Sequence, residues 1–113
     1  MDFTELYELY LNERSRFIRR VVELVILFFM LKGEGYTGEI ISFIRSNFED
    51  FNNYYIKYRS KARYIIRVIL EELVDEGLLS KKLCVISKDN IAITTYLWIV
   101  TEKFKGYFEN RVN

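Results

Sequence analysis

Apolar residues recur at three- and four-residue steps through residues 60–77, the most regular stretch of the chain. Such spacing places side chains on one face of an α-helix. The face comprises Ala62, Ile65, Ile66, Ile69, Leu70, Leu73 and Val74. Gly77 stands where a glycine with a positive φ commonly ends a helix, and Leu78 is then placed to contact Leu73. The pattern predicts a helix with one face in the core and an end at Gly77.

A long helical region is predicted upstream. Asp2 and Glu5 have the spacing of a capping box, which predicts that a helix begins near the N-terminus. Helical spacing continues to Leu31, and Gly33 supplies the positive φ that a helix exit commonly uses. The polar residues 12–16 leave open whether this region is one helix or two.

A shorter helix is predicted over residues 38–47, because Thr37 is a suitable N-cap and apolar positions again keep helical spacing. Its predicted buried side consists of Ile40, Ile41, Phe43, Ile44 and Phe48. Residues 48–59 contain an asparagine pair and crowded aromatics without a clean period. We expect a loop there that holds at most one helical turn.

A β-hairpin is predicted next, because residues 82–86 and 91–100 are rich in β-branched and aromatic side chains and residues 87–90 are typical of a turn. Thr101 is then placed to cap a short C-terminal helix. The apolar face of that helix comprises Phe104, Tyr107 and Phe108. No proline and only five glycines interrupt the chain, so helices are expected to dominate.

Composition favours one domain over residues 1–113, because half of the 113 residues are apolar and can bury a core without metal or disulfide support. The single cysteine, Cys84, and the absence of histidine indicate a reducing, cytoplasmic location and remove the usual ligands of a structural zinc site. The N-terminus lacks the basic region of a secretory signal. The apolar run at residues 24–31 is far shorter than the roughly 20 residues of a spanning helix, so no membrane partner is expected.

The sequence predicts no catalytic residue, metal ligand or cofactor, and the chain is not expected to be an enzyme. Without histidine, no pair of nucleophile and base stands out. Cys84 lies among apolar residues and is interpreted as a small buried side chain. A solvated helix face explains the acids of the helix better than a carboxylate metal site does. These acids are Glu71, Glu72, Asp75 and Glu76.

The net charge is only +1, but the basic residues are unevenly distributed. Residues 57–67 hold five basic side chains and no acid, with tyrosines interleaved. Lysine and arginine neutralise phosphates, and arginine or tyrosine can reach base edges or the backbone, so this mixture is typical of a surface that binds duplex DNA. The predicted DNA-binding residues are Lys57, Tyr58, Arg59, Ser60, Lys61, Arg63, Tyr64 and Arg67. A solvated charged face is the simpler alternative.

The position of these charges within the helix adds a second argument. We expect Lys61 and Arg63 in the first turn, where each opposes the helix macrodipole by about 0.3–1 kcal/mol, and Asp75 and Glu76 oppose it at the other end. A sequence selected for stability alone would reverse this order. An anion at the helix N-terminus would use the free N–H groups together with the basic side chains, and DNA phosphate is the obvious candidate.

Two further groups of basic residues are weaker candidates. Lysines of the hairpin could reach an adjacent groove of DNA, although edge strands and turns also carry lysine as protection against aggregation. These lysines are Lys81, Lys82 and Lys88. The arginines upstream could meet acids of the same chain, such as Glu13 or Glu23, or extend a binding surface, and we favour the structural interpretation. They are Arg14, Arg16, Arg19 and Arg20.

Two segments carry a resemblance to a known family: EELVDEGLL at residues 71–79 and YLWIVTEKFKGYFEN at residues 96–110. The first is similar to the helix that enters the wing in winged helix-turn-helix regulators of the PadR and MarR kind, and the second resembles their last wing strand and the helix after it. The resemblance spans residues 37–110. It implies a mainly helical α+β fold with a long N-terminal helix, two further helices, a two-stranded wing and a short C-terminal helix.

For function, the resemblance implies a transcriptional regulator that binds double-stranded DNA, with the helix from Ser60 in the major groove and residues 81–90 as the wing. Flanking helices build homodimers in such regulators, and aromatic residues of both terminal helices would suit an interface, although core packing explains them equally well. These aromatics are Tyr7, Tyr10, Phe104, Tyr107 and Phe108. The bias towards Ile, Tyr, Lys and Glu is similar to that of crenarchaeal and archaeal viral proteins. The alternative function is a protein–protein interaction module on the same scaffold, without DNA binding.

Overall fold

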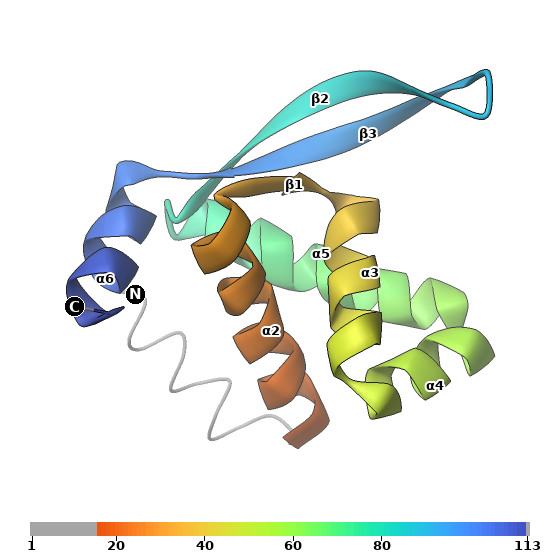
Figure 1. Ribbon diagram of the computed structural model, residues 1–113, viewed down its shortest axis with the longest axis horizontal. Helices are drawn as coiled ribbons and strands as arrows, with labels where there is room; N and C mark the ends of the chain where they lie inside the picture. Colours follow the sequence, from red (N-terminus) through yellow and green to blue (C-terminus); the bar gives the residue numbers. More distant parts are fainter. Residues whose placement is uncertain (1–15, 113) are drawn as a thin grey trace.

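The computed structural model describes residues 16–112 and has a mainly helical α+β fold, which confirms the predicted class (Figure 1). The elements in chain order are α2 (Arg16–Lys32), β1 (Glu34–Tyr36), α3 (Thr37–Asn47), α4 (Glu49–Lys57), α5 (Arg59–Asp75), β2 (Leu79–Lys88), β3 (Ile91–Val100) and α6 (Glu102–Val112). The predicted capping box at Asp2 and Glu5 lies outside the described residues, as do Tyr7, Tyr10 and Arg14.

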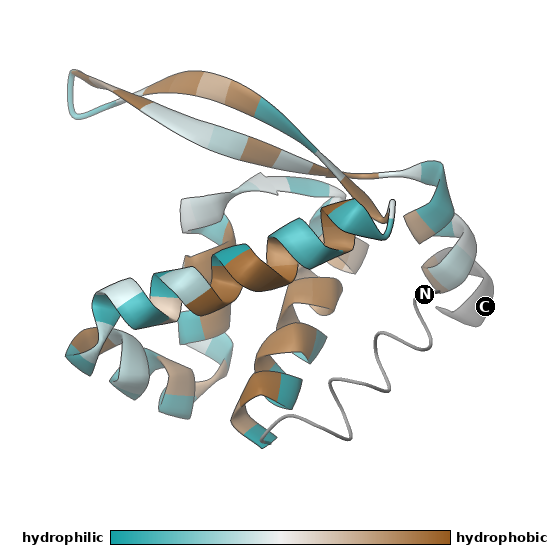
Figure 2. Ribbon diagram, turned by 180° about the vertical axis from the view of Figure 1, so that it is seen from behind, coloured by the Kyte–Doolittle hydropathy of each residue, from teal (hydrophilic) through white to brown (hydrophobic). Residues whose placement is uncertain are grey.

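Helix α2 forms the centre of the core. Its buried residues are Val21, Val22, Leu24, Val25, Ile26, Phe28 and Phe29. Figure 2 shows hydrophobic residues along almost its whole length. The helix ends at Gly33, which has the expected positive φ of 76°. Across residues 16–112, no helix combines the length and the apolar character that crossing a membrane requires.

The three strands form an antiparallel sheet in the order β1-β3-β2. Strand β1 was not predicted, because three residues carry too little pattern and the strand exists only by pairing with β3. Gly35 lies opposite Trp98, and Val100 N donates to Gly33 O at 2.9 Å. A Cβ at position 35 would lie 2.5 Å from the Phe28 ring, so β1 approaches α2 this closely only with glycine.

The loop predicted for residues 48–59 is wrong, because residues Glu49–Lys57 form helix α4. Phe51 is fully buried. The ring centroid of Phe17 in α2 lies 6.1 Å from the ring centroid of Phe51 and 5.3 Å from that of Tyr54. Glu49 and Asp50 stand in the first turn, where acids stabilise a helix. Packing of aromatic side chains therefore overrides the poor helix propensity of the asparagine pair.

Helix α5 and its end confirm the strongest prediction. Gly77 has φ 76°, its N–H donates to Val74 O at 2.9 Å, and Leu78 N donates to Leu73 O at 2.9 Å. These two bonds are those of a Schellman motif. The buried residues of the helix are Ala62, Ile66, Ile69, Leu70 and Leu73. The helix begins at Arg59, one residue before the predicted start.

Strands β2 and β3 form the predicted hairpin, which is longer in β2 than expected and extends beyond the helices (Figure 1). Asp89 and Asn90 have φ of 54° and 65° between the paired residues Lys88 and Ile91. A two-residue loop with two positive φ values is a type I′ turn, which matches the twist of the strands.

Helix α6 begins as predicted, because Phe104 N donates to the Thr101 hydroxyl at 3.3 Å. The same hydroxyl lies 2.6 Å from Gly77 O and so links the end of α5 to the start of α6. Phe104 is buried against Phe29, with ring centroids 6.4 Å apart. Helix α6 therefore closes one end of the core, at the opposite end of the molecule from α4 (Figure 1).

Candidate nucleic-acid interface

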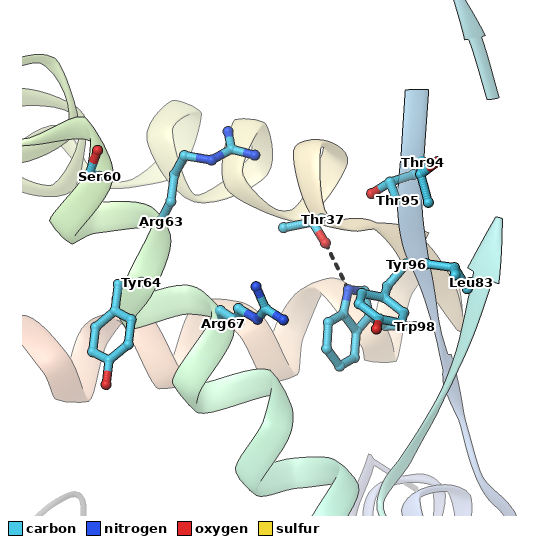
Figure 3. Close-up of a pocket in the computed structure, with 10 residues that line it drawn as sticks. All are labelled: Thr37, Ser60, Arg63, Tyr64, Arg67, Leu83, Thr94, Thr95, Tyr96 and Trp98. Carbon is cyan, nitrogen blue, oxygen red and sulfur yellow. Dashed lines mark hydrogen bonds between the residues drawn. The ribbon is translucent and has the colours of Figure 1, made fainter. Parts of the chain in front are cut away.

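A groove of about 530 Å³ separates α5 from the hairpin (Figure 3). One side is formed by the N-terminal half of α5, and the other side and floor are formed by β3, by Leu83 of β2 and by Thr37 of α3. The lining residues are Thr37, Ser60, Arg63, Tyr64, Arg67, Leu83, Thr94, Thr95, Tyr96 and Trp98. Four of them belong to the DNA-binding set predicted from the sequence: Ser60, Arg63, Tyr64 and Arg67.

The helical period explains why these four α5 residues share the groove side. Ser60 is followed by Arg63 and Tyr64 at three and four residues, and Arg67 lies one turn further on. All four are exposed, whereas Ala62 and the other apolar residues of α5 face the core. The amphipathic pattern that buries one side of α5 thus presents two arginines on the other.

The floor of the groove is fixed by Trp98, which is only 1% exposed. Its indole Nε1–H donates to the Thr37 hydroxyl at 2.9 Å and so ties β3 to the start of α3 (Figure 3). The predicted N-cap role of Thr37 is therefore wrong. Thr37 is the first residue of α3 and Tyr36 is the N-cap, where Glu39 Oε1 accepts from Tyr36 N at 3.0 Å.

One turn beyond Arg67, an ion pair joins α5 to the hairpin. Lys81 Nζ lies 2.8 Å and 2.9 Å from the two carboxylate oxygens of Glu71, and 5.0 Å from the centroid of the Tyr96 ring. The pair holds the base of the hairpin at a set distance from α5. Lys81, a predicted wing residue, is thus already neutralised within the chain.

The other predicted basic residues lie around the start of α5. Lys57 Nζ and Lys61 Nζ lie 5.4 Å and 5.2 Å from the Tyr58 ring centroid, and the Arg59 guanidinium lies 5.9 Å from the Tyr55 ring. Because the helix begins at Arg59, its first turn holds Arg59 and Lys61, and Arg63 opens the second turn. The N-cap residue Tyr58 makes no side-chain hydrogen bond to the helix.

Lys82 and Lys88 belong to the other face of the hairpin. Successive side chains of a strand point to opposite faces, and Lys81 shares the α5 side with Trp98, its partner in the ladder. The even-numbered residues of β2 therefore face away from α5. The structure brings Lys82 and Lys88 to the hairpin surface but not to the groove.

The arginines of the groove have no acidic partner in the part of the chain that the structure describes. The ion pairs among the side chains of residues 16–108 are Arg20–Glu23, Lys81–Glu71 and Lys105–Glu102. The first pair agrees with a structural role for Arg20, at 3.1 Å. Arg67 thus has no carboxylate that takes up its guanidinium donors, and Arg63 keeps the donors that its interaction with the Tyr55 hydroxyl does not use. Bidentate donors of this kind match the geometry of phosphate and of base edges.

No acid of α5 lines this groove, although Glu71 borders it through its ion pair with Lys81. Burial, together with the nearby charges of Asp75 and Glu76, raises the pKa of the Glu72 carboxyl above its ordinary value. Among the described residues, no three His, Cys, Asp or Glu side chains come close enough to hold a metal ion. Cys84 is a free, half-buried thiol on β2.

Sequence reasoning missed the contributions of β3 and of α3. Thr94, Thr95 and Tyr96 reach the groove because the hairpin folds back over α5, which is a long-range arrangement that local pattern does not encode. A second hollow, of about 300 Å³, is lined by Ser42, Arg45, Ser46 and Asn52. The three α3 residues of this hollow have the spacing of one helix face, which is the signal that could have identified them.

The sequence matches no protein-family model, and no curated protein matches it.

Proposed function

We propose that the chain is a winged helix-turn-helix protein that binds duplex DNA, with α5 in the major groove and the β2–β3 hairpin as the wing, and that it regulates transcription. The observation that carries the proposal is the pair Arg63 and Arg67, which line the groove beside α5 and have no carboxylate partner among the side chains of residues 16–108. The order of helix, short strand, helices and hairpin supports it, as do the two sequence resemblances.

The energetics of α5 support the proposal as well. Its first turn contains basic residues and no acid, and its last turn contains no basic residue. Both features are unfavourable for an isolated helix, by about 0.3–1 kcal/mol per charge. An anion bound beside the N-terminus would reverse this cost at the first turn. The major groove of DNA, about 12 Å wide, admits one α-helix with its side chains.

Fluorescence anisotropy with a labelled random duplex tests the proposal. We expect the parent to bind at micromolar protein and low salt. A variant that loses phosphate contacts should show a slope of log K against log[salt] that is smaller in magnitude by about 0.9 for each contact removed. The test variant combines Lys61→Ala, Arg63→Ala and Arg67→Ala. The matched control combines Arg20→Ala, Lys32→Ala and Lys105→Ala, which remove the same charge from residues outside the groove. Equal affinity and slope for the folded test variant and the parent would refute the proposal.

A protein–protein interaction module is the second candidate, favoured by the apolar surface of the hairpin. Leu83, Val85, Ile91 and Ile93 are 38–70% exposed. Leu83 and Val85 lie on one face of the hairpin and Ile91 and Ile93 on the other. Exposed apolar patches are typical of protein contacts. No duplex binding at micromolar protein and low salt would favour this candidate.

Dimerisation remains a separate proposal. Phe104 is buried within the chain, and Tyr107 and Phe108 pack against the same core. These three aromatics therefore have a structural role in the monomer. Light scattering of the full chain distinguishes a dimer from a monomer.

A further inference from the structure

Three arginines from two helices surround one tyrosine of α4. The Arg45 guanidinium of α3 lies 4.1 Å from the centroid of the Tyr55 ring, and that of Arg59 lies 5.9 Å from it. Burial raises the pKa of Tyr55, but the interaction of its hydroxyl with Arg63 and the positive charges of Arg59, Arg63 and Arg45 outweigh burial and lower the pKa below its ordinary value of 10.0. Helix α4 thus collects positive charge from α3 and α5 at one point.

Among the side chains that the structure describes, those of residues 16–108, no carboxylate forms an ion pair with any of these arginines. Three like charges repel one another, and the tyrosine ring offsets the repulsion only in part, because a cation–π contact contributes about 0.5–2 kcal/mol. A chain that needed arginine here only for packing would gain by placing an acid beside it. The cluster is instead left with an excess of positive charge, which an anionic ligand would neutralise.

Arg45 is held in place for such a ligand. Its Nε donates to Asn52 Oδ1 of α4 at 2.8 Å, and its Cζ lies over the Tyr55 ring, 4.1 Å from the ring centroid. An arginine carries five N–H donors, so the two terminal nitrogens keep their donors after the Nε bond is made. Fixing the guanidinium in advance lowers the entropy that binding would otherwise cost.

The hollow beside Arg45 supplies further donors. Ser42 and Ser46 are exposed, and they line the hollow of about 300 Å³ together with Arg45 and Asn52. They stand three residues before and one residue after Arg45, so the three side chains share one side of α3. A guanidinium flanked by two hydroxyls suits the oxygens of a phosphate group.

We propose that Arg45, Ser42 and Ser46 bind a phosphate of the DNA backbone outside the groove of α5, so that α3, with Arg45 held by Asn52 of α4, extends the DNA-binding surface. The inference rests on the proposed function. We call Tyr55 with Arg45, Arg59 and Arg63 the Tyr55 cluster. Arg63 belongs both to this cluster and to the lining of the α5 groove, so the groove is continuous with the surface around Arg45. This continuity favours a backbone phosphate over a free anion. A duplex seated against Arg63 would therefore pass close to the hollow.

The salt dependence of duplex affinity tests the inference in the full chain. Arg45→Ala is expected to weaken binding several-fold and to reduce the slope of log K against log[salt] by about 0.9, the value for one phosphate contact. Arg45→Lys keeps the charge and is expected to keep the slope. Lys105→Ala is the matched control, because it removes one positive charge from α6, at the far end of the molecule (Figure 1). It is expected to bind as the parent does.

A second variant guards against loss of fold in Arg45→Ala. Ser42→Ala combined with Ser46→Ala changes two exposed positions without changing the charge, and it is expected to weaken binding with the far-UV circular dichroism unchanged. An unchanged affinity and slope for Arg45→Ala, in a parent that binds duplex, would overturn the inference and leave the proposed function standing. A parent that binds no duplex would overturn both. Saturation of the site by millimolar inorganic phosphate, with no change in the duplex slope, would identify a free-anion site and also overturn the inference.

Discussion

The hydrogen bond between Trp98 and Thr37 links the sheet to α3 beneath the groove, and Thr37→Val removes its acceptor. Valine keeps the shape of threonine, so the substitution leaves the Trp98 N–H without its partner in a site where the ring is 1% exposed. A buried donor left unsatisfied costs about 1–3 kcal/mol, whereas the net contribution of an ordinary hydrogen bond is about 0.5–1.5 kcal/mol. We therefore expect Thr37→Val to lower the free energy of unfolding by about 1–3 kcal/mol.

A double-mutant cycle separates this bond from a capping role for Thr37. If the hydroxyl serves Trp98, Thr37→Val becomes almost neutral in a Trp98→Phe background, because phenylalanine has no donor, and the coupling free energy is about 1–2 kcal/mol. If the hydroxyl instead capped α3, valine would cost about 1 kcal/mol in both backgrounds.

Urea denaturation provides the assay. Far-UV circular dichroism follows all four proteins, because fluorescence of the single tryptophan is lost in the Trp98→Phe variants. Thr37→Ser is the matched control, because it keeps the acceptor, and it is expected to lose much less stability than Thr37→Val. Additive effects of the two substitutions, with a coupling free energy near zero, would refute the reasoning.

Three further predictions concern packing and charge. Gly35→Ala forces a methyl group against the Phe28 ring, so thermal unfolding should show a loss of about 1–3 kcal/mol, the usual cost of overpacking. Glu72→Gln should stabilise the protein at pH 7 by about 0.3–1 kcal/mol, because the raised pKa of Glu72 means that its ionised form disfavours folding. This gain should vanish as the pH falls below 4.5, because the carboxyl then becomes neutral in both the folded and the unfolded protein. Titration of absorbance at 295 nm, taken as the difference between the parent and Tyr55→Phe, should give a midpoint below 10.0, which Arg63→Ala should raise.

Local chemistry was enough to predict the ends of elements. The glycine at position 77 and the hydroxyl of Thr101 act on backbone groups within a few residues, and both make the expected hydrogen bonds. The helix α5 could likewise be predicted, because seven apolar residues recur with helical spacing and so mark one face as part of the core. The presence of two arginines on its exposed side could therefore be derived before the fold was known.

Long-range packing decided what local pattern could not. Thr37 has the chemistry of an N-cap, but the buried indole of Trp98, distant in sequence, takes its hydroxyl. Strand β1 has three residues and forms only because β3 pairs with it. Helix α4 was hidden by its asparagines, and its stability comes from contacts such as that between Phe17 and Phe51. In each case the deciding partner lies in another element.

In the groove, too, one part could be predicted from local pattern and the other depends on long-range packing. The α5 side was predicted residue by residue, whereas the β3 side depends on how the hairpin folds back, and Lys82 and Lys88 lie on the face away from α5. The Tyr55 cluster could not be derived at all, since it requires α4 to be a helix. The phosphate contact proposed for Arg45 of α3, which Asn52 of α4 holds in place, is thus the largest change to the functional hypothesis.

Chemical-shift mapping of the ¹⁵N-labelled full chain, titrated with a duplex at low salt, tests whether α5 and the hairpin bind DNA. We expect the amides that shift to lie in the first half of α5, along the groove side of β3 and around Arg45, with α6 unaffected. Shifts confined to the apolar end of the hairpin or to α6, or no shifts at millimolar duplex, would contradict this prediction.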